Sequence, residues 1–513
     1  MSTSQPLHSG EAPLTGKMLW IAALALAAGN FVAVLDTTIA NVSVANIAGG
    51  LGVTSSQGTW VITSYAVAEA ITVPLTGWLA ARFGAVRVFV TSMLMFGLCS
   101  ALCGFANSLG LLIAARILQG LAGGPLMPLS QTLLLRIFPK GKAGAATGIW
   151  AMTTLIAPIM GPILGGVLCD QASWPWIFFI NVPIALACAW FSWGLLKRYE
   201  HALERFSFDA IGLGLLIVWV GALQIMLDEG KDQDWFASTE ICILAFVAVI
   251  GFAAFLVWEL TEEHPIVDLR VFRHRGYTMS LVTLVLAFGG FFSISVLTPL
   301  WLQSYMGYTA TWAGMTTAWS GVLAVMTAPL VAAMAMKMDG RKLVFVGVSW
   351  LGLVTLWRAF GVTDMTYWQI ALPLLLMGLG MPLFFVPLTG LALSSVDEEE
   401  TASAAGLMNF MRTLSGAFAT SLVNTVWENR IRFNHASLVG QLDVSGESTR
   451  GLLDSGMSMD SVRATLDRIL ESQSVMLATN QLFMAIAVIL IIAALTIWLA
   501  PKPSRVADTS AAH

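Results

Sequence analysis

Three charged residues lie within long apolar stretches of the sequence and are its strongest candidates for chemistry. Asp36, Glu69 and Arg116 each occur in a segment that is otherwise almost free of charge. A charged side chain inside a membrane costs about 2.5 to 3.5 kcal/mol, so it is retained for a partner or a function. At a rise of 1.5 Å per residue, all three lie roughly 10 to 15 Å from the outer surface. An acid buried beside an arginine can bind and release a proton, so these residues predict a proton-coupling site.

Each charged residue also has a structural interpretation. An ion pair of Asp36 or Glu69 with Arg116 could simply lock helices together, and for Arg116 both interpretations stay open. Glu69 could instead recognise a cation or be a hydrogen-bonded structural acid. Arg412 could contact an anionic group or pack between helices. Arg358 lies near the outer end of its segment, where we expect its side chain to extend toward water.

One apolar segment carries glycine and proline at regular spacing. Small residues recur every four positions, at Ala157, Gly161 and Gly165, so one helical face permits close contact with a neighbour, and prolines permit a bend. The pattern predicts either a functional helix contact or plain tight packing. Its members are Gly148, Pro158, Gly161, Pro162, Gly165 and Gly166.

Membrane helices must position these residues. The chain has 513 residues, of which 57% are hydrophobic and only 11% are charged, whereas a soluble domain carries about 25% charged residues. Apolar runs long enough to cross about 30 Å of hydrocarbon predict an all-α polytopic protein with fourteen spans. The spans are expected near 18–44, 59–80, 88–106, 109–133, 143–168, 176–196, 209–227, 237–258, 278–302, 310–335, 343–362, 367–394, 402–427 and 476–499.

We expect two six-helix bundles with two linker helices between them. A faint internal repeat supports this plan, because Arg82 and Arg87 have the same spacing as Lys337 and Lys342. The predicted parts are a tail at 1–17, an N-terminal bundle at 18–206, linker helices at 207–260, a C-terminal bundle at 261–500 that includes a long loop at 428–475, and a tail at 501–513.

Lys and Arg collect on alternate connections between the predicted spans. One missed span would invert every later connection, so this alternation supports the count and predicts that both termini are cytoplasmic. The residues on the expected inner side are Lys17, Arg82, Arg87, Arg136, Lys140, Lys142, Lys197, Arg198, Arg205, Arg270, Arg273, Arg275, Lys337, Arg341, Lys342, Lys502 and Arg505.

Other classes of function lack support in the sequence. The net charge is -4 and the basic residues are dispersed, so no nucleic acid is expected as a partner. The five cysteines have no metal-ligand spacing, and no HExxH or GxSxG pattern indicates an enzyme. Since there is also no GxxxxGK[ST] loop, we expect a proton gradient as the energy source, with no cofactor and no metal.

Several motifs resemble those of the major facilitator superfamily, in particular its fourteen-helix drug:proton antiporters of the Emr and Far type. They are Leu35-Asp36-Thr37-Thr38-Ile39-Ala40-Asn41-Val42, the stretch from Gly77 to Arg87, Arg116-Ile117-Leu118-Gln119-Gly120, and the Gly148 to Gly166 pattern. The resemblance implies that Gly77, Arg82, Gly84 and Arg87 form a gating motif, although Ala81 stands where the family has an acid. It also implies that the Gly148 to Gly166 pattern is the antiporter motif.

The resemblance implies a proton-coupled exporter of hydrophobic or amphipathic compounds in a bacterial inner membrane. Members of this group work with a periplasmic adaptor and an outer-membrane channel. The alternatives are a proton-coupled importer of a small solute and a membrane receptor or scaffold.

The long loop at 428–475 contains an amphipathic pattern. Its apolar face carries Val462, Leu466, Ile469 and Leu470, after the candidate caps Ser458 and Asp460. We expect a helix that docks the adaptor, or one whose apolar face lies on the membrane or covers the transporter's own outer mouth.

Overall fold

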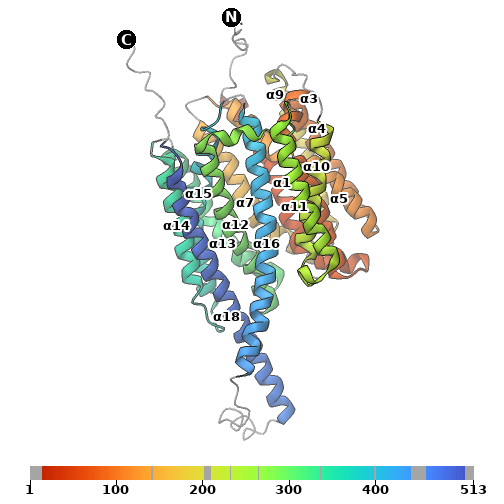
Figure 1. Cartoon of the computed structure of the whole chain (residues 1–513), viewed down its shortest axis with the longest axis vertical. Helices are drawn as coiled ribbons and strands as arrows, with labels where there is room; N and C mark the ends of the chain where they lie inside the picture. The colour runs from red at the N-terminus through yellow and green to blue at the C-terminus, as the bar shows by residue number, and fades with distance from the viewer. Residues whose placement is uncertain are drawn as a thin grey trace, which may run out of the picture.

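The protein is a bundle of long helices that run roughly parallel to one another (Figure 1). The computed structural model describes residues 14, 16–139, 143–200, 209–231, 233–263, 265–335, 337–397, 400–440 and 458–502. The predicted tails fall almost wholly outside these residues, as do Lys140, Lys142, Arg205 and Arg505. Twelve helices in the described residues are long and apolar enough to cross a membrane. The other two predicted spans correspond to α2 with α3 and to α16, so the all-α fourteen-span fold is confirmed.

The first six spans are built from nine helices, because three of the spans are interrupted, two at proline or glycine and one at Ile180. Pro74 separates α2 from α3, and Gly124-Pro125 separates α5 from α6, since proline has no N–H to donate to the preceding turn. Their bounds are α1 Gly16–Leu51, α2 Ser55–Thr72, α3 Thr76–Phe83, α4 Ala85–Gly104, α5 Leu109–Gly123, α6 Leu126–Ile137, α7 Ala143–Gln171, α8 Trp176–Phe179 and α9 Asn181–Leu196.

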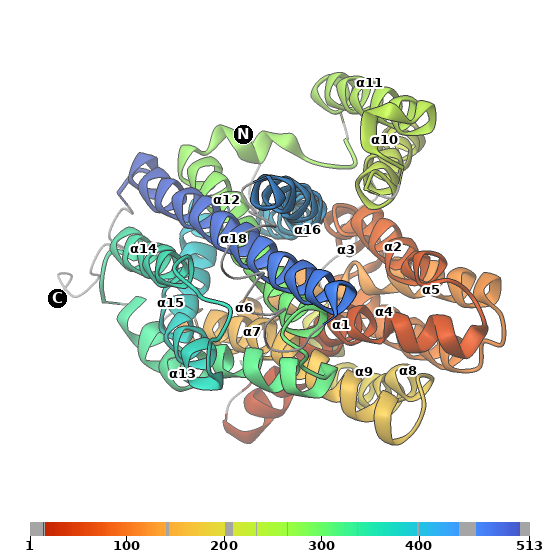
Figure 2. The same cartoon turned by 90° about the horizontal axis from the view of Figure 1, so that it is seen from below.

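The linker helices α10 (Ala210–Glu229) and α11 (Thr239–Thr261) pack side by side at the edge of the bundle (Figure 2). They lie beside α2 on one side and α16 on the other. The remaining helices form the second bundle. They are α12 Arg275–Ser304, α13 Ala310–Ala335, α14 Gly340–Arg358, α15 Tyr367–Leu393, α16 Thr401–Val439 and α18 Met459–Thr496.

Helix continues into the predicted loop at 428–475 from both sides, and the helix expected after Ser458 and Asp460 is confirmed. The α16 helix runs to Val439, and α18 begins at Met459 and continues without a break into the last span. These two extensions, which we call the hairpin, project beyond the other helices (Figure 1). Charged residues after Trp427 ended the apolar run that set the predicted boundary, but charges outside the membrane do not stop a helix.

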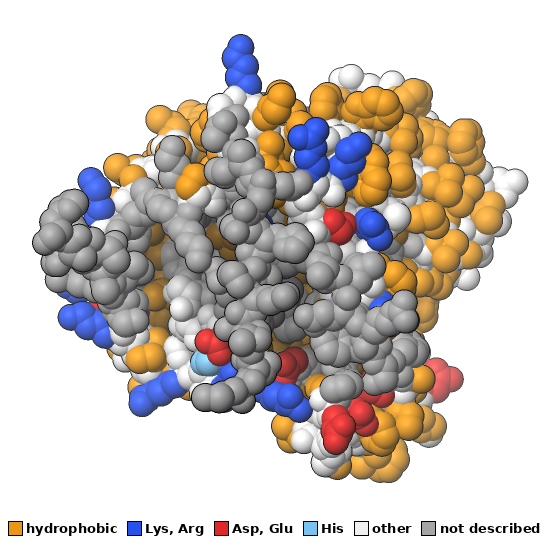
Figure 3. All heavy atoms as spheres, turned by 90° about the horizontal axis from the view of Figure 1, so that it is seen from above, with side chains coloured by type: hydrophobic (Ala, Val, Ile, Leu, Met, Phe, Trp, Pro, Cys, Tyr) orange, Lys and Arg blue, Asp and Glu red, His pale blue; other side chains and the backbone are white. Residues whose placement is uncertain are grey.

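The opposite end of the molecule carries lysines and arginines around its rim (Figure 3). We call this end the basic face. The first turns of α1 reach it, since the Trp20 ring packs on Phe138. The chain returns there after α18, where Ala500 accepts a hydrogen bond of 3.0 Å from Arg341 Nη1. The hairpin therefore lies on the far face, away from both ends of the described chain.

Candidate functional site

Asp36 and Arg116 form an ion pair in the interior of the first bundle. Arg116 Nη1 on α5 lies 2.5 Å from Asp36 Oδ2 on α1, and both side chains are 0% exposed. Arg116 Nε also donates to the Val61 carbonyl of α2 at 3.0 Å. The pair therefore joins three helices, α1, α2 and α5.

Two amides complete the surroundings of the Asp36 carboxylate. Gln119 Nε2 and Asn181 Nδ2 both donate to Asp36 Oδ1, at 2.9 and 2.7 Å. Gln119 Oε1 in turn accepts from Arg116 Nη1 at 2.9 Å. The Tyr65 ring lies 4.1 Å from the guanidinium carbon of Arg116, where its face attracts the cation. The carboxylate is thus held by an arginine and two amides, with no water required.

This arrangement can convert a proton into helix movement. Every partner of Asp36 among the described residues donates a hydrogen bond to it, so a proton added to the carboxyl finds no acceptor among them and removes the negative charge that they stabilise. Protonation also leaves Arg116 buried without its counter-ion, and a buried charge that loses its partner costs about 3 to 5 kcal/mol. The fold can relieve this cost only by moving α1, α5 or α9 or by admitting water.

The small-residue face of α7 packs directly on the helix that carries Asp36. A methyl group added to Gly161 would lie 2.2 Å from Thr38 Oγ1, and one added to Gly165 would lie 3.1 Å from the Ile39 carbonyl oxygen. The Thr38 hydroxyl also donates to the Ala157 carbonyl at 3.4 Å. Pro158 and Pro162 lie inside α7 without ending it.

Another face of α7 packs on the second bundle. Methyl groups added to Gly148 and Gly166 would lie 3.1 Å from the Ala332 Cβ and 3.2 Å from Thr311 Oγ1, both on α13. Since these glycines lie near opposite ends of α7, the two bundles are in contact along most of its length. The α7 helix thus connects the Asp36 helix to the opposite bundle.

Glu69 of α2 and Arg412 of α16 are further buried charged residues, on helices of different bundles. Glu69 lies within electrostatic range of Arg412 as well as of Asp36 and Arg116. Arg412 Nη2 lies 2.8 Å from Met127 Sδ, and its guanidinium faces the Trp150 and Phe288 rings at 5.5 and 5.7 Å. Of the predicted three-residue set, Asp36 and Arg116 are therefore in direct contact, and Glu69 lies within electrostatic range of both.

The predicted gating motif contacts a carboxylate that the sequence did not reveal. Gly84 has φ of 94°, and an added methyl group there would lie 2.4 Å from the Glu200 carboxyl carbon. Glu200 accepts hydrogen bonds from the Val86 and Arg87 backbone N–H groups, at 3.2 and 3.0 Å, and so caps α4. Gly77 approaches Ser403 of α16, where an added methyl group would lie 2.8 Å from Oγ. Arg82 forms no salt bridge within the described residues.

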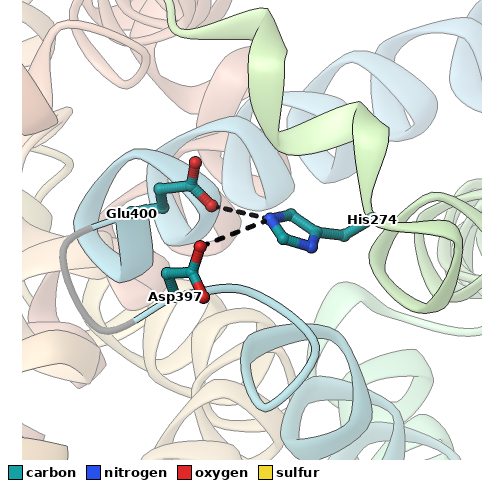
Figure 4. Close-up of side chains that lie close together, drawn as sticks. All are labelled: His274, Asp397 and Glu400. Carbon is teal, nitrogen blue, oxygen red and sulfur yellow. Dashed lines mark hydrogen bonds and ion pairs between the residues drawn. The ribbon is translucent and has the colours of Figure 1, made fainter.

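A further polar cluster on the basic face has side chains of metal-binding type. His274 Nε2 lies 2.8 Å from Glu400 Oε2 and 4.0 Å from Asp397 Oδ2, with all three side chains pointing toward one another (Figure 4). Arg273 Nη2 lies 2.8 Å from Glu400 and 3.2 Å from Asp397. Because Arg273 already supplies the positive charge, a salt-bridge network between α12 and the start of α16 accounts for this cluster.

Sequence reasoning missed the polar partners of Asp36 and misplaced one arginine. Gln119 follows Arg116 by three residues, a spacing that brings side chains together on a helix, whereas Asn181 had no comparable signal. Arg358 was expected to extend toward water, which is wrong, because it is 7% exposed and donates to Thr298 Oγ1 at 2.8 Å.

Comparisons with known proteins agree with this architecture. The chain is 41% identical over 498 residues to the multidrug export protein EmrB of Escherichia coli (strain K12), covering 96% of this chain and 97% of that protein. It is 41% identical over 495 residues to the fatty acid resistance protein FarB of Neisseria gonorrhoeae, covering 96% and 98%.

Solved structures share the fold at low sequence identity. The proton:xylose symporter XylE superposes with a TM-score of 0.60 at 12% identity, covering 94% of this chain and 96% of the symporter. The human organic anion transporter MFSD10 superposes with a TM-score of 0.57 at 13% identity, covering 93% and 100%. The family model of the Major Facilitator Superfamily matches residues 26–420. The chain is therefore a multi-pass membrane transporter rather than an enzyme, and it belongs to the major facilitator superfamily.

Proposed function

We propose that this protein is a proton-coupled antiporter that exports hydrophobic or amphipathic toxic compounds across a bacterial inner membrane. The observation that carries the proposal is the fully buried Asp36–Arg116 pair next to the glycine face of α7. The names of the relatives, a multidrug export protein and a fatty acid resistance protein, support export as the direction and amphipathic molecules as the cargo.

The coupling route runs from Asp36 through α7 to the second bundle. When a proton reaches Asp36, the ion pair opens and α1 shifts against Gly161 and Gly165. Because the other face of α7 contacts α13, this shift changes the packing between the two bundles, which is the movement that alternating access requires. Gly77, Gly84 and Arg87 belong to the contact at the basic face that has to open in the same cycle.

The substrate passes between the bundles near Glu69 and Arg412. Aromatic and thioether groups surround Arg412, and such side chains adapt to apolar molecules of different shapes. Glu69 offers a negative charge to cationic compounds, and Arg412 offers a positive charge to anionic ones.

We place the basic face in the cytoplasm together with both termini, and the hairpin in the periplasm. Lysine and arginine are enriched on the cytoplasmic side of membrane proteins, and the basic face carries Arg87, Lys197, Arg198 and Lys342 as exposed side chains.

The hairpin is the docking element for a periplasmic adaptor, which in turn connects to an outer-membrane channel. Val462 is fully buried and His435 lies 3.5 Å from Asp467, so the two arms pack on each other rather than on the membrane. Phe433 and Ile469 remain 64% and 51% exposed, and apolar groups of this kind form the centre of protein interfaces.

The function is tested in proteoliposomes with an imposed pH gradient. With an acidic lumen, an antiporter accumulates a fluorescent amphipathic substrate in the lumen as protons leave, whereas a symporter expels it. An uncoupler should abolish accumulation. Expulsion of the substrate, insensitivity to the uncoupler or a requirement for ATP would each contradict the proposal.

The adaptor contact is tested with the double variant Phe433→Ser/Ile469→Ser, with the exposed Arg463→Gln as control. Replacement of residues 431–472 by a Gly/Ser linker is the stronger perturbation. Reconstituted transport should survive in all of them. Whole-cell resistance and co-purification of the adaptor should fall in the double variant and the linker variant only. Wild-type co-purification in the linker variant would exclude docking on the hairpin.

A further inference from the structure

Of the three arginines buried in the described spans, one lacks a counter-ion. Arg116 pairs with Asp36, and Arg412 experiences the charge of Glu69. Arg358, at the last residue of α14 near the far face, forms no salt bridge with any described residue. A buried cation is costly unless it is paired. The lack of an acidic partner for Arg358 indicates that an anion from outside the chain binds beside it.

The contacts of Arg358 satisfy only part of its guanidinium. Nη2 donates to Thr298 Oγ1 on α12 at 2.8 Å, and Nη1 lies 3.9 Å from Met377 Sδ on α15, a weak contact. The Phe483 ring of α18 lies 4.2 Å from the guanidinium carbon, where it stabilises the positive charge without accepting a conventional hydrogen bond. A guanidinium has five N–H donors, so most of them have no oxygen partner among the described residues.

Arg358 lines a cavity with a second available donor. The enclosed space of the cavity is about 10 Å³, room for about one water-sized atom. Its other lining residues are Trp301, Met365, Gln369, Ile370, Met476 and Phe483. Gln369 Oε1 is used by the Thr366 backbone N–H at 2.7 Å, which leaves the Gln369 amide N–H groups available at the exposed rim. The cavity thus presents a buried cation and an amide donor among apolar walls.

An apolar groove begins close by on two helices that contribute to the cavity. Gly352 and Leu356 of α14 and Ala487 and Ile491 of α18 line it, and no polar atom is exposed within it. Ala487 lies one helical turn from Phe483, toward the middle of the membrane. The exposed residues Leu353 and Val488 at its edge open it to lipid.

We propose that the anionic head group of an amphiphile, a carboxylate or a phosphate, binds at the mouth of this cavity with one oxygen inside it, so that Arg358 is its counter-ion and the α14–α18 groove holds its chain. The site is separate from the Asp36 pair, because it lies within the second bundle and uses none of the coupling residues. Two sources fit the chemistry, an anionic phospholipid of the outer leaflet and a free amphiphilic anion.

The test measures binding without any gradient, so its outcome does not depend on the proposed transport cycle. Dodecanoate and uncharged 1-dodecanol are titrated against the full chain in phosphatidylcholine nanodiscs, and retained phosphatidylglycerol is quantified by mass spectrometry. Loss of a charge-assisted hydrogen bond weakens binding about tenfold to a hundredfold. Arg358→Gln should therefore weaken dodecanoate binding, release retained phosphatidylglycerol, or do both. Arg468→Gln, an exposed arginine on the same face, should do neither.

A second variant keeps the proposal testable if Arg358→Gln folds poorly. Gln369→Glu preserves the acceptor for Thr366 and places a carboxylate at the rim, so it should raise the thermal midpoint and weaken dodecanoate binding. Phosphatidylglycerol that competes with dodecanoate identifies a site shared with lipid, whereas dodecanoate binding unaffected by phosphatidylglycerol identifies the free anion as the ligand. Equal affinity for dodecanoate and dodecanol without retained phosphatidylglycerol, or unchanged binding in both variants, overturns the proposal.

Discussion

The Asp36–Arg116 pair can be tested with a double-mutant cycle. In Asp36→Asn, an uncharged amide replaces the carboxylate oxygen that lies 2.5 Å from Arg116 Nη1. Arg116 is then buried without a counter-ion, which costs about 3 to 5 kcal/mol of unfolding free energy. Arg116→Gln has a similar cost, because the carboxylate keeps only the Gln119 and Asn181 amides. In the double variant neither charge remains, so the two losses should not add, and a coupling energy of about 2 to 3 kcal/mol is expected.

Two assays distinguish the coupling role from a purely structural one. Unfolding in sodium dodecyl sulfate gives the free energies of the cycle, and pH-driven accumulation in proteoliposomes gives transport. The double variant should recover most of its stability but no uphill transport, because it has no titrating group at this position. Additive losses of stability would refute the inferred pairing energy. Uphill transport by Asp36→Asn would remove Asp36 from the mechanism.

Three further predictions concern packing, capping and pH. Gly161→Leu should abolish pH-driven transport, since even a methyl group at Gly161 would lie 2.2 Å from Thr38 Oγ1. The control Gly221→Leu on α10, where a methyl group would have no atom within 4 Å, should transport like wild type. Equal activity of the two variants would show that the α1–α7 contact is incidental. Glu200→Ala should lower the unfolding free energy by about 1 kcal/mol through loss of the α4 cap, and an unchanged value by chemical unfolding would argue against capping. Arg341, which hydrogen-bonds to Asp339, lowers the pKa of that carboxyl outside the spans. The stability that this contact contributes is present at pH 7 and is lost as the pH falls below about 4. Arg341→Gln should therefore lower the thermal midpoint at pH 7, and the difference from wild type should shrink on acidification; a difference independent of pH would contradict this.

The sequence predicted the fold and the central pair because both depend on position along a helix. Apolar length determines where a helix crosses the membrane, and the residue count from each helix end placed Asp36 and Arg116 at one depth. The same count placed Glu69 with them. It could not reveal that Arg412, on a helix of the other bundle, also lies within electrostatic range of Glu69.

Contacts between distant segments were beyond the reach of local patterns. Glu200 caps α4 from 113 or more residues away along the chain. The sequence showed that Ala81 replaces the acid of the motif, but it gave no indication that the Glu200 carboxylate lies beside the same motif. The Arg358 side chain was expected to extend toward water because Arg358 lies at the end of its helix. It is buried instead, because α12, α15 and α18 pack around it. The end of α16 was placed at Trp427 because the apolar run stops there, although mutual packing with α18 carries the helix to Val439.

The continuity of α16 and α18 through the membrane makes the hairpin a lever. Its arm past Trp427 has about 12 residues, or roughly 18 Å at 1.5 Å per residue. If the second bundle rocks by about 15°, the angle of a typical rigid-body transition, the tip travels roughly 5 Å further than the point where the helix leaves the membrane. A protein bound at the tip is displaced in every cycle. Its contact with the hairpin must therefore be flexible, or it must pass the movement on to the next protein in the assembly.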